Sequence, residues 1–244
     1  MLHPDTPYNQ RPYQTIYLDM DGLLANFHLE AIRQYMRAGF RFKELNHHGT
    51  PLSLSNDTLN AAWQNKPGQS LQKAFGLPVG DDFWKPIDRE PMFWDMIQPY
   101  SHAKALVELV QPYCEHLVII SYAHRTPDCY RGKRAWLDAH GFHTKEFITC
   151  QEKWRLSRRD TLLIDDHDRQ CNNFAKPQCR PDTPCEAAIE IDQQSKLSSY
   201  DYHTCHGDAL LFPTWWNDNY QYATTPLSYI TTFLNDKANL LPTS

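Results

Sequence analysis

The sequence predicts an α/β protein built on a doubly wound parallel sheet, with a small helical cap inserted after the first strand and helix. From residue 101 onward, short apolar runs alternate with segments of helical spacing, which is typical of a parallel sheet. Between residues 41 and 98 no strand alternation is visible, and aromatic residues and prolines are frequent. We therefore expect a core formed by residues 15–40 and 99–244 and a helical cap formed by residues 41–98.

The first strand and helix come from the beginning of the chain. Residues 15–18 form a short apolar run that Gly22 soon follows, which predicts a buried strand. Residues 27–40 have apolar side chains at helical spacing, with an end expected near Gly39. The cap follows directly, and its Trp63, Trp84 and Trp94 could form its core or stack on a planar ligand.

The remaining elements alternate along the second half of the chain. Strands are expected over 116–120, 146–150, 161–164 and 208–212, and helices over 101–113, 127–140 and around 226–234. Ser101 is a suitable N-cap, and Pro127 occupies a favoured first-turn position. The charged run of Arg131, Lys133 and Arg134 on the helix over 127–140 is expected to face solvent.

Composition excludes several classes of protein. The 244 residues carry a net charge of -5, which disfavours a dedicated nucleic-acid binder. No segment approaches the roughly 18 to 20 consecutive apolar residues of a membrane span, and no secretory signal is visible, so we expect a cytoplasmic protein. Seven cysteines, an odd number, fit a reducing compartment.

Two carboxylates two residues apart follow the first strand. Side chains at this spacing on a strand face the same way, so Asp19 and Asp21 emerge together at the carboxyl end of the strand, where α/β sheets bind ligands. Paired carboxylates there can hold a divalent cation and divide the roles of nucleophile and general acid/base. A calcium loop is excluded, because Leu23 and Leu24 stand where it needs an oxygen ligand and a glycine.

Other polar residues come at or after later strands. Ser121, Lys153, Asp165 and Asp166 can converge with the first pair, because parallel strands end at one edge of the sheet. The set suits phosphoryl transfer. Asp19 would attack phosphorus, Asp21 would act as acid and base, and Ser121 and Lys153 would bind phosphoryl oxygens, while Asp165 and Asp166 would complete a Mg²⁺ site.

Four motifs of this chain resemble, in their order, those of the haloacid dehalogenase superfamily of phosphohydrolases. They are Asp19-Met20-Asp21-Gly22, Ser121, Lys153 and Ile164-Asp165-Asp166. The likeness covers roughly residues 15–235 and is closest to the 5'(3')-deoxyribonucleotidases, whose first motif also extends to a phenylalanine at the position of Phe27. It implies a Rossmann-like core, with Asp19 as nucleophile and metal ligand. It further implies that the Asp21 backbone carbonyl binds the metal, that Asp165, Asp166 or both also bind it, and that Phe27 lines a nucleobase pocket.

The chain departs from the family pattern in two stretches. Tyr122-Ala123-His124-Arg125 follows Ser121, so His124 or Arg125 would supply the second phosphate contact. The stretch 175–206 is longer than the family needs. Cysteines and histidines in and beside this stretch could bind zinc, namely Cys171, Cys179, Cys185, Cys205, His203 and His206. They lack the paired spacing of common structural zinc sites, so we expect the cysteines to be free thiols.

We therefore expect a Mg²⁺-dependent phosphomonoester hydrolase that acts on (deoxy)ribonucleoside monophosphates. One alternative is the same chemistry on another small phosphomonoester or on a nucleic-acid 3' phosphate. Another is a catalytically silent protein that binds a nucleotide or a partner. The expected partner is a small-molecule nucleotide, without membrane association or stable nucleic-acid binding, and a homodimer is compatible with the sequence.

Overall fold

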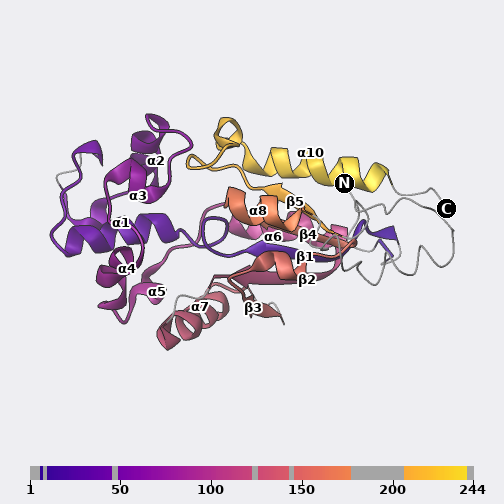
Figure 1. Cartoon of the computed structure of the whole chain (residues 1–244), viewed down its shortest axis with the longest axis horizontal. Coiled ribbons are helices and arrows are strands. Elements are labelled where there is room, and N and C mark those ends of the chain that lie inside the picture. Colours follow the sequence, from indigo (N-terminus) through magenta and orange to yellow (C-terminus); the bar gives the residue numbers. More distant parts are fainter. Residues whose placement is uncertain are drawn as a thin grey trace, which may run out of the picture.

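A five-stranded parallel sheet forms the centre of the molecule, in the order β3-β2-β1-β4-β5 (Figure 1). The computed structural model describes residues 6–7, 10–45, 49–122, 126–142, 146–176 and 206–240. The strands are β1 (Tyr13–Asp19), β2 (Cys114–Ser121), β3 (Phe147–Thr149), β4 (Thr161–Asp165) and β5 (Asp208–Leu211). The predicted doubly wound α/β fold is confirmed.

The central position of β1 sets up the site. β1 pairs with β2 on one side and β4 on the other, so that Asp19 lies opposite Ile120 and Leu18 opposite Ile164. All five residues of β4 are buried, as expected for a strand covered on both faces. The polar residues that end β1, β2 and β4 therefore meet at one edge of the sheet.

Helices from the second half of the chain flank the sheet (Figure 1). They are α6 (Ala103–Val110), α7 (Pro127–Ala139), α8 (Asp168–Phe174) and α10 (Pro226–Asn239), with short 3-10 turns η4 (Gln111–Tyr113), η5 (Lys153–Leu156) and η7 (Tyr220–Tyr222). The N-cap of α6 is His102 rather than the predicted Ser101, and no side chain caps this helix end. The last helix extends beyond its predicted end at residue 234 to Asn239.

The first helix and the predicted cap lie together beyond one end of the sheet (Figure 1). This group comprises α1 (Phe27–Arg37), η2 (Lys43–Leu45), η3 (Pro51–Ser53), α2 (Asn56–Gln64), α3 (Leu71–Phe75), α4 (Asp81–Asp88) and α5 (Phe93–Met96). As predicted, residues 41–98 contain helices and no strand among those described. α1 packs against α4 and α5, although it belongs to the range predicted as core.

Two further properties concern helix length and the cysteines. No helix in the described part of the chain is both long enough and apolar enough to span a membrane. In that same part of the chain, Cys114, Cys150 and Cys171 are free thiols, which agrees with the expectation for Cys171.

Candidate active site

Three buried carboxylates meet at the carboxyl edge of the sheet. Asp19 ends β1, Asp165 ends the neighbouring strand β4, and Asp166 follows it. One carboxylate oxygen from each lies within 4.8 Å of the others, and all three residues are buried. Burial, with repulsion from the neighbouring carboxylates, raises the pKa of Asp19 to about 7. The same two causes raise the pKa of Asp166.

One buried lysine faces this cluster. Lys153 lies in η5, and its Nζ is 2.6 Å from Asp165 Oδ2 and 2.7 Å from Asp19 Oδ1. Burial alone would lower the pKa of this lysine, but the Asp165 and Asp19 carboxylates outweigh it and raise the pKa above its ordinary value. Lys153 is therefore a fixed positive charge at the predicted nucleophile.

The carboxylate cluster suits a hard divalent cation. Three carboxylates with one ammonium leave an excess of negative charge in a buried place, and the raised pKa values of Asp19 and Asp166 reflect it. Mg²⁺ is bound in proteins through a small number of carboxylates and retained waters. Asp19, Asp165 and Asp166 therefore have the donor chemistry and the proximity that such an ion needs.

Asp166 is held from two sides. The indole Nε1 of Trp216 donates to its Oδ2 at 2.9 Å, and the Asn217 amide donates to its backbone carbonyl at 2.9 Å. On the other side lies Gly22, whose φ of +86° favours glycine. A Cβ at this position would lie 2.0 Å from Asp166 Oδ2, so the close approach also requires glycine.

A second cluster surrounds Asp21. Ser121, the last residue of β2, donates to Asp21 Oδ2 at 3.1 Å, and Lys133 Nζ contacts the same oxygen. Lys133 also donates to Ser121 Oγ and to the Tyr122 carbonyl, each at 2.7 Å. Asp21 Oδ1 is buried without a hydrogen-bond partner within the described part of the chain. One oxygen of Asp21 is thus fixed while the other is left for another partner.

The prediction that Lys133 faces solvent is wrong. This side chain is 1% exposed and lies 4.7 Å from the centre of the Trp94 ring. Its two charged neighbours behave as predicted, because Arg131 and Arg134 form exposed ion pairs with Asp128 and Asp138. The misassigned lysine thus belongs to the candidate site.

The two clusters open onto a shared cavity of about 700 Å³ between the sheet edge and the cap helices. Its walls include Asp19, Asp21, Lys133, Lys153, Asp165 and Asp166, together with the aromatic residues Phe27, His28, Phe83, Trp84 and Trp216. The predicted phosphate residue Ser121 is buried behind Asp21 and is not part of the cavity wall. Of the remaining predicted residues, His124 lies outside the described residues.

Aromatic rings from α1 and the cap form one part of this cavity. The centre of the Phe27 ring is 5.8 Å from that of Trp84 and 5.7 Å from that of Phe93. Trp84 lines the cavity, whereas Trp63 is fully buried and belongs to the core of the cap. An apolar wall therefore faces the charged wall formed by the sheet edge.

Two cavity residues, Trp216 and His28, were not predicted as site residues. Trp216 comes from the segment after β5, and its ring lies 4.1 Å from that of His28, measured between ring centres. Burial lowers the pKa of His28 to about 4, and the charge of Asp21 opposes this shift only in part. Both residues reach the site through tertiary packing between distant segments.

Most of the proposed zinc residues fall outside the described residues, namely Cys179, Cys185, Cys205 and His203. Of the other two, Cys171 donates its thiol to the Asp165 carbonyl at 3.6 Å, and His206 Nδ1 lies 3.3 Å from the Gly207 carbonyl. The zinc hypothesis therefore stays a prediction.

One comparison with known proteins, the scan against family models, identifies the family of this chain. The family model described as 5' nucleotidase, deoxy (pyrimidine), cytosolic type C protein matches residues 13–191. A search of curated proteins finds no match. Among solved structures, a haloacid dehalogenase family hydrolase from Deinococcus radiodurans R1 with bound phosphate and sodium is similar at 12% identity and a TM-score of 0.42, covering 96% of this chain and 100% of that one. The magnesium-bound hydrolase YfnB from Bacillus subtilis is similar at 15% identity and a TM-score of 0.37, covering 64% of this chain and 80% of that one.

Proposed function

The chain belongs to the family of deoxy (pyrimidine) 5' nucleotidases of cytosolic type C, and on this premise we propose that it is a Mg²⁺-dependent hydrolase of (deoxy)ribonucleoside monophosphates. The observation that carries the proposal is the placement of Asp19 and Asp21 on one cavity. Lys153 and the Asp165–Asp166 pair lie on the same wall. A nucleophile, an acid/base and a cation site thus face the same space.

In the proposed first step, a carboxylate oxygen of Asp19 attacks the phosphorus of the bound monophosphate. The bond from phosphorus to the ester oxygen breaks as the new bond forms, and Asp21 gives its proton to the departing nucleoside hydroxyl. The product left on the enzyme is an aspartyl-phosphate.

In the second step, Asp21 takes a proton from a water molecule, which attacks the phosphorus and releases inorganic phosphate and the free Asp19 carboxylate. The contacts of Ser121 and Lys133 fix Asp21 Oδ2 and leave Oδ1 to handle the proton. Lys153 holds Asp19 in place and offers its charge to the phosphoryl oxygens.

Asp19, Asp165 and Asp166 would hold the Mg²⁺, with the Asp21 carbonyl as a further ligand. When bound, the ion neutralises charge between the anionic nucleophile and the anionic substrate. The carboxylates need this compensation because Lys153 is the only cation paired with them among the described residues.

The apolar wall of the cavity supports a nucleoside as the leaving group. Phe27 and Trp84 would contact the base, since stacking on aromatic rings suits any nucleobase. In the proposed division of the chain, the cap (41–98) and Phe27 of the core cover the base, while the rest of the core (15–40 and 99–244) binds the phosphate. A cytoplasmic location and a homodimer remain proposals of the same kind.

The test is a panel of phosphate esters with and without Mg²⁺. We expect phosphate release from deoxyribonucleoside 5'-monophosphates with Mg²⁺ and none after chelation by EDTA. A preference for another phosphomonoester, such as a sugar phosphate or an oligonucleotide 3' phosphate, would redirect the substrate assignment. Nucleotide binding without release from any ester would favour the silent binding protein.

A further inference from the structure

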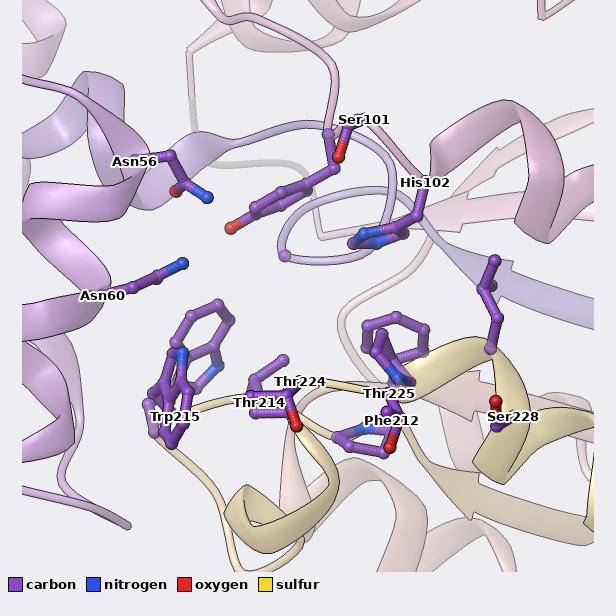
Figure 2. A pocket seen from close by; sticks show the side chains of 17 residues that line it. Asn56, Asn60, Ser101, His102, Phe212, Thr214, Trp215, Thr224, Thr225 and Ser228 are labelled. Carbon is purple, nitrogen blue, oxygen red and sulfur yellow. The ribbon is translucent and has the colours of Figure 1, made fainter.

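A second cavity of about 500 Å³ lies behind the turn that contains Gly22, between α2, the start of α6 and the segment that connects β5 to α10 (Figure 2). It shares Gly22 and Trp216 with the neighbourhood of the active site, but none of the predicted catalytic residues lines it. Its volume is in the range of about 300 to 1,000 Å³ that small-molecule sites occupy.

The walls of this cavity carry no formal charge among the described residues. They consist of aromatic rings, amides and hydroxyls, from Asn56, Asn60, Tyr100, Ser101, His102, Phe212, Thr214, Trp215, Trp216, Thr224, Thr225 and Ser228 among others. Burial lowers the pKa of His102, while the contact of its Nε2 with the Leu23 carbonyl, at 3.1 Å, opposes this shift. An anionic ligand would find no compensating cation here, and the walls fit an uncharged one.

One unpartnered polar group, the hydroxyl of Thr214, points to a ligand in this cavity. Thr214 is 5% exposed, and its Oγ1 is buried with no hydrogen-bond partner in the described part of the chain. A buried hydroxyl without a partner costs free energy unless something binds it. Figure 2 shows Asn60 pointing into the cavity from α2, with Thr214 and Trp215 on another side of it.

We propose that this cavity binds an uncharged nucleoside, at a site separate from the catalytic cavity. Trp215, Trp216 and Phe212 offer apolar surface for a planar base, and the Asn60 amide and Thr214 hydroxyl offer hydrogen bonds to its polar edge or to the sugar. The choice of a nucleoside among uncharged heterocycles rests on the proposed function, whose product is a nucleoside. A nucleoside monophosphate would bring charge that these walls do not compensate.

The test measures thymidine binding by calorimetry in a Trp84→Ala background, which weakens base binding in the catalytic cavity. Two changes then target the second cavity: Asn60→Leu, at a partly exposed position, and the isosteric Thr214→Val. We expect each to weaken thymidine binding roughly tenfold, because each removes a hydrogen-bonding group from the site. The matched control is Gln64→Leu, at an exposed position on the same helix that does not line the cavity.

Circular dichroism identifies the variants that remain folded, and either of the two suffices for the comparison. Thymidine affinity unchanged within twofold in the folded variants, or no thymidine binding at millimolar concentration, would overturn the proposal. The measurement involves no turnover. Failure of the proposed function would instead appear as absent phosphate release by the unmodified chain, so the two failures are distinguishable.

Discussion

Lys133 donates a hydrogen bond to Asp21 from a helix that lies 112 residues further along the chain. The lysine is 1% exposed, and its charge is paired with a carboxylate that the proposed mechanism uses as acid and base. The same ammonium contacts Ser121 and the Tyr122 carbonyl, so a single side chain ties the ends of β1 and β2 together. Lys133 is thus a positioning residue for Asp21 in the proposed mechanism.

Replacing Lys133 by methionine should therefore reduce both activity and stability. The variant leaves Asp21 without its cation, so we expect kcat to fall by about 10² or more. The free energy of unfolding should fall by roughly 2 to 4 kcal/mol. Phosphate release and urea unfolding measure the two effects. Arg134→Met is the control, because Arg134 lies on the same helix in an exposed ion pair, and equal losses in both variants would contradict a specific role for Lys133.

Gly22→Ala tests the close approach of the first turn to Asp166. A Cβ at Gly22 would collide with Asp166 Oδ2, so we expect the carboxylate to move and the apparent Mg²⁺ affinity to fall roughly 10- to 100-fold. Gly39→Ala is the matched control, because Gly39 has a similar φ of +95° but no atom within 4 Å of its added Cβ. A Mg²⁺ titration of activity separates the two variants. Equal Mg²⁺ affinities in them would mean that backbone strain alone explains the effect.

His28 predicts a dependence of stability on pH. Burial lowers its pKa to about 4 in the folded chain, against an ordinary value of 6.5, so the unfolded chain binds the proton more readily. The contribution of His28 to stability is therefore complete above about pH 6.5 and is lost as the pH falls toward 4, by up to about 1.4 kcal/mol per pH unit. In urea unfolding between pH 7 and 4, His28→Gln should lose less stability than the unmodified chain does. His116→Gln, at an exposed position, is the control variant, and a His28→Gln profile parallel to that of the unmodified chain would refute this assignment.

Trp84→Ala tests the proposed contact with the nucleobase. Loss of one stacking surface, at about 1 to 3 kcal/mol, should reduce kcat/KM for deoxyribonucleoside monophosphates by roughly 10- to 100-fold. Hydrolysis of glycerol phosphate, which has no base, should change by less than about threefold. Tyr130→Ala removes an exposed aromatic residue outside the cavity and serves as the control. Equal losses of activity on both substrates would mean that Trp84→Ala acts by disturbing the fold and not by removing a contact with the base.

The sequence predicted the parts of the site that follow from local patterns. Asp19, Ser121 and Asp165 each end an apolar run, and a parallel sheet brings such ends together, so their proximity could be expected. Lys133 was misassigned because charged neighbours suggested a solvated face. Its spacing from Cys129, Trp136 and Leu137, which form the buried stripe of α7, was the signal that could have revealed it.

Other features of the site could not be predicted from local patterns. Trp216 reaches Asp166 across 50 residues of sequence, and His28, from the start of α1, packs directly against Trp216. Their contacts depend on the path of the segment after β5. The spacing of apolar residues in the sequence does not encode this path. The second cavity likewise arises where α2 meets this segment.

The central claim is that Asp19 attacks phosphorus, and Asp19→Asn tests it most directly. The asparagine has nearly the same shape and removes one charge from a crowded buried cluster, so the fold should survive with no loss of thermal stability. The measurement is phosphate release from a deoxyribonucleoside 5'-monophosphate with Mg²⁺, for both proteins at equal concentration. We expect turnover by the unmodified chain and a loss of roughly 10³-fold or more in the variant. Turnover by a folded Asp19→Asn protein at a rate close to that of the unmodified chain would contradict the aspartyl-phosphate mechanism.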